Sequence, residues 1–140
     1  MIDEYDEQIN ALEDEIERHV LESAAAQRLL SIPGVGQFTA AVVIAEIGEI
    51  ERFDSDNALV SYAGLDPVVH QSGDKEIHSS ISKEGSAPLR WALIQAAHTA
   101  VRCDDYFGNF YTRLKQRKNH QVAIVATARK MLVSIYYMLT

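Results

Sequence analysis

The sequence predicts a mainly α-helical fold, in which a coiled-coil helix at the N-terminus precedes a compact helical domain. Three observations predict it. Apolar residues recur at helical spacing along most of the 140 residues. Capping residues and terminating glycines divide this pattern into pieces of helix length. Only one long segment, residues 67–85, lacks the helical period.

The first predicted element is an acidic coiled-coil or linker helix over residues 1–28. Five of its apolar residues follow the a and d spacing of a coiled coil, 3, 4, 3 and 4 apart: Ile2, Tyr5, Ile9, Leu12 and Ile16. Such a narrow stripe needs a partner helix, either from a second copy or from sequence outside this chain. Packing of the helix against its own domain is an equally favoured alternative.

Residues 29–140 are predicted to form the compact domain, which begins with a helix-hairpin-helix over about residues 29–48. Pro33 and two glycines interrupt the helical pattern at the centre of this element. An apolar helix then runs from about Phe38 until Gly48 ends it.

A short helix, the irregular segment and three longer helices complete the domain. Asp54 or Ser55 caps the short helix, and Gly64 ends it. The irregular segment is polar, with a small hairpin expected about Gly73-Asp74. Ser86 caps the first of three longer helices, which are expected at about residues 88–103, 105–117 and 120–139.

Charge is distributed unevenly along a chain whose net charge is −7. Residues 1–30 carry nine acidic and two basic side chains, whereas residues 101–140 carry two acidic and seven basic ones. The basic C-terminal part is therefore suited to phosphate although the protein as a whole is acidic.

Cysteine content and hydropathy favour a cytoplasmic protein without a membrane partner. The single cysteine, Cys103, excludes an internal disulfide and a metal site built from several cysteines. No uninterrupted apolar run approaches the roughly 20 residues that span a bilayer. The first residues also lack the charged-then-apolar pattern of a secretory leader.

The predicted hairpin is the first candidate nucleic-acid contact. Its glycines let the backbone approach a ligand closely, and the amides that begin the next helix suit a phosphate oxygen. Gly34, Val35 and Gly36 would thus bind through backbone donors, without reading the base sequence. The alternative is a helix connection in which glycine only relieves crowding.

Basic side chains supply two further candidates. Lys83 and Arg90 flank a predicted helix start, where cations add to the positive end of the helix, although a solvated turn also explains them. A non-specific phosphate patch is expected at Arg113, Lys115, Arg117 and Lys118. Four aromatic residues precede it, and such residues belong more often to a core than to a base-stacking surface: Tyr106, Phe107, Phe110 and Tyr111.

The irregular segment contains a candidate nucleophile at Ser72, followed by Gly73. A serine needs a base or a metal ion for this role, and the spacing of His70 and His78 does not identify either as that base. On spacing alone, an exposed turn serine is favoured. The histidines and carboxylates also show no HExxH or similar metal-binding pattern.

Seven short motifs in series change this interpretation. Their order and spacing over residues 29–139 resemble the C-terminal domain of IS110-type insertion-sequence transposases, the group that includes IS116, IS902 and the Piv/MooV DNA invertases. The motifs are LxSIPGVGxxTA, RFDS, YAGLDP, QSG, ISKEG, PLRWAL and VAxVATARKML. The acidic helix before them resembles the end of the coiled coil that joins this domain to a catalytic N-terminal one.

The resemblance implies a recombinase in which two domains share the chemistry. A RuvC-like N-terminal domain, outside this chain, would hold Mg²⁺ with acidic residues. The family serine falls on Ser72, which would attack the DNA phosphodiester and form a covalent link. Members of the insertion-sequence branch use a bridge RNA as guide and assemble as tetramers. This chain alone is therefore expected to be inactive and to hold no cofactor itself.

At two places near Ser72 this sequence departs from the family pattern and has neutral or acidic residues. The stretch between Pro67 and Ser72 is VVHQ, where basic residues would suit DNA better, and Glu76 and Glu84 lie close in sequence. The leading hypothesis is a serine-bearing transposase domain that binds DNA and a guide RNA. A non-catalytic nucleic-acid-binding and oligomerisation module is the alternative, and a purely structural oligomerisation domain is a third.

Overall fold

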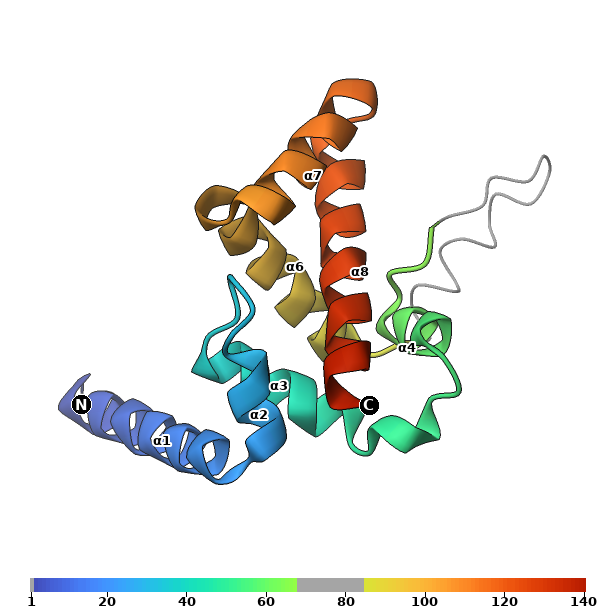
Figure 1. Cartoon of the computed structure of the whole chain (residues 1–140). Coiled ribbons are helices and arrows are strands. Elements are labelled where there is room, and N and C mark those ends of the chain that lie inside the picture. The colour runs from blue at the N-terminus through green and yellow to red at the C-terminus, as the bar shows by residue number, and fades with distance from the viewer. Residues whose placement is uncertain (1, 68–84) are drawn as a thin grey trace.

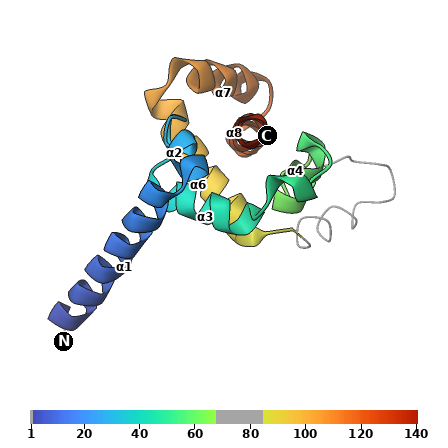
Figure 2. The same ribbon diagram turned by 60° about the horizontal axis from the view of Figure 1, so that its bottom comes forward.

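The helix α8 (His120–Leu139) forms the centre of the molecule in a computed structural model that describes residues 2–67 and 85–140 (Figure 1). Its neighbours surround it when it is viewed nearly along its axis (Figure 2). It packs closely against three helices: α4 (Asp56–Ala63), α6 (Ala87–Cys103) and α7 (Asp105–Arg117). All regular elements in the described ranges are helical, so the predicted mainly α fold is confirmed.

The core is built from the inward faces of these helices and of α3 (Gln37–Ile47). By length and composition, α8 is the one helix of the described ranges that could cross a membrane. Here its apolar side chains fill the interior instead. The largest fully buried core residues include Leu29, Val43, Ile47, Leu59, Leu65, Leu89, Leu93, Met131, Leu132 and Ile135.

The predicted helix over residues 1–28 is divided in two, α1 (Ile2–Glu22) and α2 (Ala24–Leu29). The hydroxyl of Ser23 accepts a hydrogen bond from the amide of Ala26 at 3.0 Å and so caps α2. Only the last turns of α1 contact the body, where Val20 is 1% exposed. The rest of α1 projects from the molecule, as Figure 2 shows.

The middle of the chain follows the predicted boundaries closely. Gly48 ends α3 at a φ of 66°, and Gly64 ends α4 in the left-handed region at 72°. Ser55, rather than Asp54, caps α4. A short 3-10 turn, η1 (Ile50–Arg52), was not predicted.

The three later helices also begin where their capping residues place them. Side-chain oxygens of Ser86, Asp104 and Asn119 accept backbone hydrogen bonds at the starts of α6, α7 and α8. The predicted small hairpin about residues 73–74 lies outside the described residues.

Candidate active site and nucleic-acid interface

The described residues on the two sides of the irregular segment meet at the C-terminal end of α4. The amide of Ser86 donates to the carbonyl oxygen of Tyr62 at 2.6 Å. Gly85 lies so close that a Cβ there would clash with the same carbonyl oxygen. A glycine is therefore required by the close approach of two backbones.

Ser86 joins α6 to α3 as well as capping its own helix. Its hydroxyl donates to Glu46 Oε1 at 2.6 Å and accepts from the amide of Leu89 at 3.1 Å. The residue is 8% exposed, so both interactions are largely shielded from water. A carboxylate acceptor makes the first of them a charge-assisted hydrogen bond.

The C-terminal end of α3 is fixed to α4 by Arg52 of η1. The guanidinium donates to the carbonyl oxygens of Ile47 at 2.8 Å and Glu46 at 3.1 Å. It also lies over the rings of Phe53 and Tyr62, 4.3 and 4.8 Å from their centroids. Arg52 thus contacts both the Glu46 backbone and the Tyr62 ring, and the Tyr62 hydroxyl donates directly to the Glu46 carbonyl oxygen at 3.4 Å.

The residues before the irregular segment are held by α8. Arg129 Nε donates to the carbonyl oxygen of Leu65 at 2.7 Å, and Ser61 Oγ donates to Asp66 Oδ2 at 2.7 Å. Burial lowers the pKa of Arg129, and the negative charge of Asp66 opposes this shift. Asp66 Oδ1 is buried and has no hydrogen-bond partner in the structure as described.

We call this set of contacts the loop anchor: Glu46, Tyr62, Leu65, Ser86 and Arg129. It brings together side chains or carbonyls from α3, α4, α6 and α8 and fixes where the chain leaves α4 and where it enters α6. Ser72 and Lys83 lie between these points, outside the described residues. The anchor also places Arg90, whose Nη1 lies 3.4 Å from the carbonyl oxygen of Ala63.

Sequence reasoning did not identify Glu46, Arg52 and Arg129 as members of this site. Two of them belong to motifs of the series, Arg52 to RFDS and Arg129 to VATARK. Glu46 could have been noticed for another reason, because it is the one charged residue of α3, a helix that is apolar apart from Gln37 and Thr39 in its first turn.

The glycine turn divides into a packed part and an open part. Gly34 has a φ of 89° and lies against α6, where a Cβ would clash with the carbonyl oxygen of Ala96. Val35 is buried. Gly36 is exposed, precedes α3 without a capping side chain, and has open space around its Cα. Crowding therefore accounts for Gly34, and the start of α3 is the part of the turn open to a ligand.

The four basic residues at the end of α7 occupy two faces. Arg113 and Arg117 line a hollow of about 370 Å³ together with Phe110, Leu114 and Gln116. Lys115 points elsewhere, with Nζ 5.8 Å from the centroid of the Tyr111 ring. Lys118 follows the last turn and is exposed.

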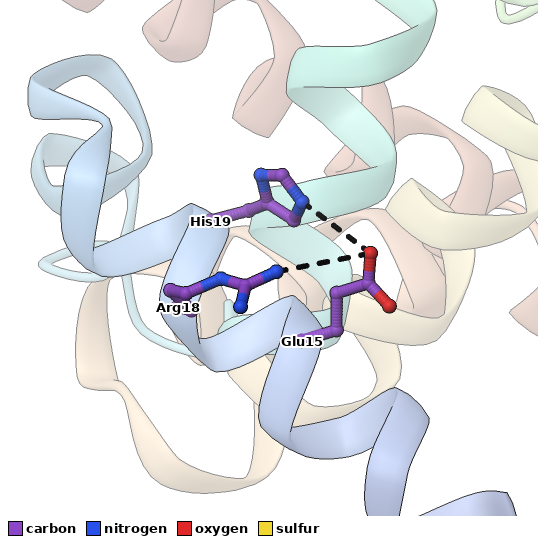
Figure 3. Close-up of polar contacts among 3 residues, drawn as sticks. All are labelled: Glu15, Arg18 and His19. Carbon is purple, nitrogen blue, oxygen red and sulfur yellow. Dashed lines mark ion pairs between the residues drawn. The ribbon is translucent and has the colours of Figure 1, made fainter.

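Among the described residues, no acidic side chain lies within 4.0 Å of these four cations. In residues 2–67 and 85–140, ion pairs within 4.0 Å occur at Glu15, which contacts Arg18 at 3.9 Å and His19 at 3.7 Å on α1 (Figure 3). The acidic helix thus forms its ion pairs within itself.

The aromatic residues of α7 differ in exposure. Phe107 is 5% exposed and belongs to the core as expected, but Tyr106 is 61% exposed. Within the ranges that the structure describes, no three His, Cys, Asp or Glu side chains are grouped so as to hold a metal ion.

The sequence of this helical domain matches that of transposases. The family described as "Transposase IS116/IS110/IS902 family" matches residues 26–112. The chain belongs to this transposase family, which confirms the resemblance found in the motif series.

Three relatives illustrate the match. The transposase for insertion sequence element IS1111A of Coxiella burnetii is 36% identical over 139 residues, 96% of this chain and 38% of the relative. A probable family 20 transposase of Pseudomonas aeruginosa is 35% identical over 126 residues, 87% of this chain and 37% of the relative. The pilin gene-inverting protein of Moraxella bovis is 40% identical over 116 residues, 79% of this chain and 35% of the relative. The chain therefore spans less than two fifths of the length of these proteins.

Proposed function

We propose that this chain is the serine-bearing, DNA-binding domain of an insertion-sequence transposase and that Ser72 is its nucleophile. The loop anchor carries the proposal. Four helices contribute to it, and the hydrogen bonds from Arg129 and Ser86 fix both ends of the segment in which Ser72 lies. A nucleophile needs such a rigid base, because small misplacements of the attacking atom are costly in rate.

The proposed reaction exchanges one phosphodiester for another. A bond forms between Ser72 Oγ and the DNA phosphorus, the bond from phosphorus to one deoxyribose oxygen breaks, and that oxygen takes up a proton. The serine proton passes to a base. The phosphoserine link conserves the energy of the broken bond for rejoining. We assign the Mg²⁺ that would polarise the phosphate to a RuvC-like domain of the longer protein.

Nucleic acid would meet this domain at several phosphate contacts. The amides that begin α3 at Gly36 suit a phosphate oxygen, and the exposed Arg113, Lys115, Arg117 and Lys118 add positive charge. Arg90 and Lys83 lie on the α6 side of the segment that bears Ser72. A guide RNA would supply sequence specificity by base pairing, since backbone contacts carry none.

The test traps covalent protein–DNA adducts formed by the full-length protein, its candidate RNA and a DNA with both element ends. Ser72→Ala is expected to abolish the adduct and leave DNA binding intact, whereas Ser79→Ala is the matched control and keeps it. Arg129→Ala is expected to slow adduct formation, because the Leu65 carbonyl loses its donor. If the adduct still forms with Ser72→Ala, the nucleophile is another residue, such as Ser79, Ser80 or Ser82.

A second candidate function, a non-catalytic binding and oligomerisation module, is favoured by α1. Three residues of its apolar stripe are exposed, Tyr5 by 61%, Ile9 by 52% and Leu12 by 60%. A second copy would cover them as a coiled coil. The two candidates differ in the adduct assay: a module yields no adduct from an RNA-loaded, DNA-bound wild-type complex.

A further inference from the structure

One side of α7 carries exposed rings and cations together. With 3.6 residues per turn, the four positions 106, 110, 113 and 117 fall within an arc of about 60° on the helix. They are occupied by Tyr106, Phe110, Arg113 and Arg117. Tyr106 and both arginines are exposed, and Phe110 is half-buried at the edge of the hollow that the arginines line.

Lys130 of α8 joins this side of α7. Its Nζ lies 4.7 Å from the centroid of the Phe110 ring and 5.4 Å from that of Tyr106. Contact with two rings restrains a side chain that is otherwise flexible, and it holds the ammonium group between them. We name these five residues the α7–α8 stripe: Tyr106, Phe110, Arg113, Arg117 and Lys130.

The stripe contains no acidic side chain. Asp104 and Asp105 lie just before it, and Asp104 Oδ2 is occupied by the amide of Phe107 at 2.9 Å, as the cap of α7. No carboxylate of the described ranges lies within 4.0 Å of the three cations in the stripe. Its surface is therefore positive and partly aromatic over the roughly 16 Å between positions 106 and 117.

Rings and cations in one row fit an unpaired nucleic-acid strand better than a duplex. Unpaired bases offer their faces for stacking, whereas in a duplex those faces are covered by neighbouring base pairs. A duplex would use Arg113, Arg117 and Lys130 and offer the exposed Tyr106 ring no base face to stack on.

We propose that the α7–α8 stripe binds a single strand of nucleic acid, with a base stacked on the exposed Tyr106 ring and phosphates paired with Arg113, Arg117 and Lys130. This inference rests on the proposed nucleic-acid-binding function and adds the form of nucleic acid that one surface takes. Base faces and phosphates are common to DNA and RNA, so strands of both kinds are expected to bind.

The experiment measures the affinity of this chain for a labelled 12-nucleotide oligothymidylate, an oligouridylate and a DNA duplex of 12 base pairs. Tyr106→Ala is expected to weaken binding of both single strands by roughly 5- to 150-fold, the effect of one to three kcal/mol per stacked base. Tyr106→Phe keeps the ring and stays within about twofold of wild type. Tyr5→Ala is the matched control, because Tyr5 is also 61% exposed but lies on α1.

The arginines give an independent readout. Replacing Arg113 and Arg117 together by Ala should reduce the slope of log affinity against log salt for the single strand by about 1.4, at roughly 0.7 per phosphate contact. The stripe proposal is overturned if Tyr106→Ala weakens single-strand and duplex binding by the same factor. It is also overturned if Tyr106→Ala weakens neither. Duplex binding alone would leave the proposed function intact and refute only the stripe, whereas binding of no nucleic acid would count against both.

Discussion

At the scale of the residue, Ser86 serves two helices with one hydroxyl. It accepts the amide hydrogen bond that caps α6 and donates to Glu46 of α3. Because Ser86 is 8% exposed, water replaces these partners poorly, and loss of either one leaves a polar group without its hydrogen bond.

Removing the carboxylate therefore has a measurable effect on stability. Glu46→Ala is expected to lower the free energy of unfolding by about 1–3 kcal/mol, because the Ser86 hydroxyl loses its acceptor. Glu46→Gln keeps an oxygen in place and should cost less than about 1 kcal/mol. Urea titration of both variants and of a double mutant with Ser86→Ala checks this. Additive effects in the double mutant would show that the two side chains do not stabilise each other.

Two glycines of one turn provide a second, matched prediction. Gly34→Ala is expected to destabilise the chain by roughly 2–5 kcal/mol, since its φ of 89° disfavours a side chain and the new Cβ would clash with α6. Gly36→Ala should cost less than about 1 kcal/mol, because the space around it is open. Thermal unfolding of the two variants measures both effects. Equal losses of stability in the two variants would contradict the packing described for Gly34.

At the scale of the element, α1 has two parts with different partners. Val20 near its end is buried against the body, but Ile9 and Leu12 are exposed on the part that projects. Residues exposed in the monomer contribute little to its stability, so substitutions there separate association from folding.

Ile9→Lys combined with Leu12→Lys is expected to keep the wild-type unfolding temperature at low protein concentration and to weaken self-association at high concentration. Light scattering over a dilution series measures this. Glu13→Lys, a change of charge outside the stripe, serves as the control. Unchanged association of the double variant would exclude the stripe as the contact between copies.

The helices could be predicted from sequence because their ends depend on neighbouring residues. Ser55, Ser86 and Asn119 cap helices through amides three residues away, within the reach of local reasoning. The break at Ser23 was missed because Ser23 interrupts a pattern with strong helix formers on both sides.

The loop anchor could not be derived in the same way. Ser86 and Glu46 are 40 residues apart in sequence, and Arg129 and Leu65 are 64 apart. Only the packing of α3, α4, α6 and α8 brings these pairs together. The exposure of Tyr106 could not be predicted either. Some of the four aromatic residues of α7 face the core and others face solvent, and their sequence does not separate the two groups.

At the scale of the whole molecule, acidic and basic parts are separated. Within the described ranges, the ion pairs lie on α1, and the cations of α7 have no acidic side chain within 4.0 Å. The two helices lie at different ends of the molecule (Figure 1). An anionic ligand would thus be attracted to the end of the molecule that lies away from the projecting helix.

The chain alone is expected to leave supercoiled DNA intact in the presence of Mg²⁺, since the proposed metal site belongs to another domain. Gel analysis of plasmid nicking checks this expectation, with the full-length protein and its RNA as the positive control. Nicking by the chain alone that disappears in Ser72→Ala would show that the serine domain is sufficient for cleavage.

The anchoring of Leu65 and Ser86 to one end of α4 has a consequence for how such a domain diversifies. The cost of closing a loop grows only with the logarithm of its length, so once both ends are fixed, insertions between them change the stability of the core little. The proposed nucleophile Ser72 and the residues that form the core can then be altered separately. A stretch exchanged between residues 67 and 85 would then leave the helical scaffold unchanged.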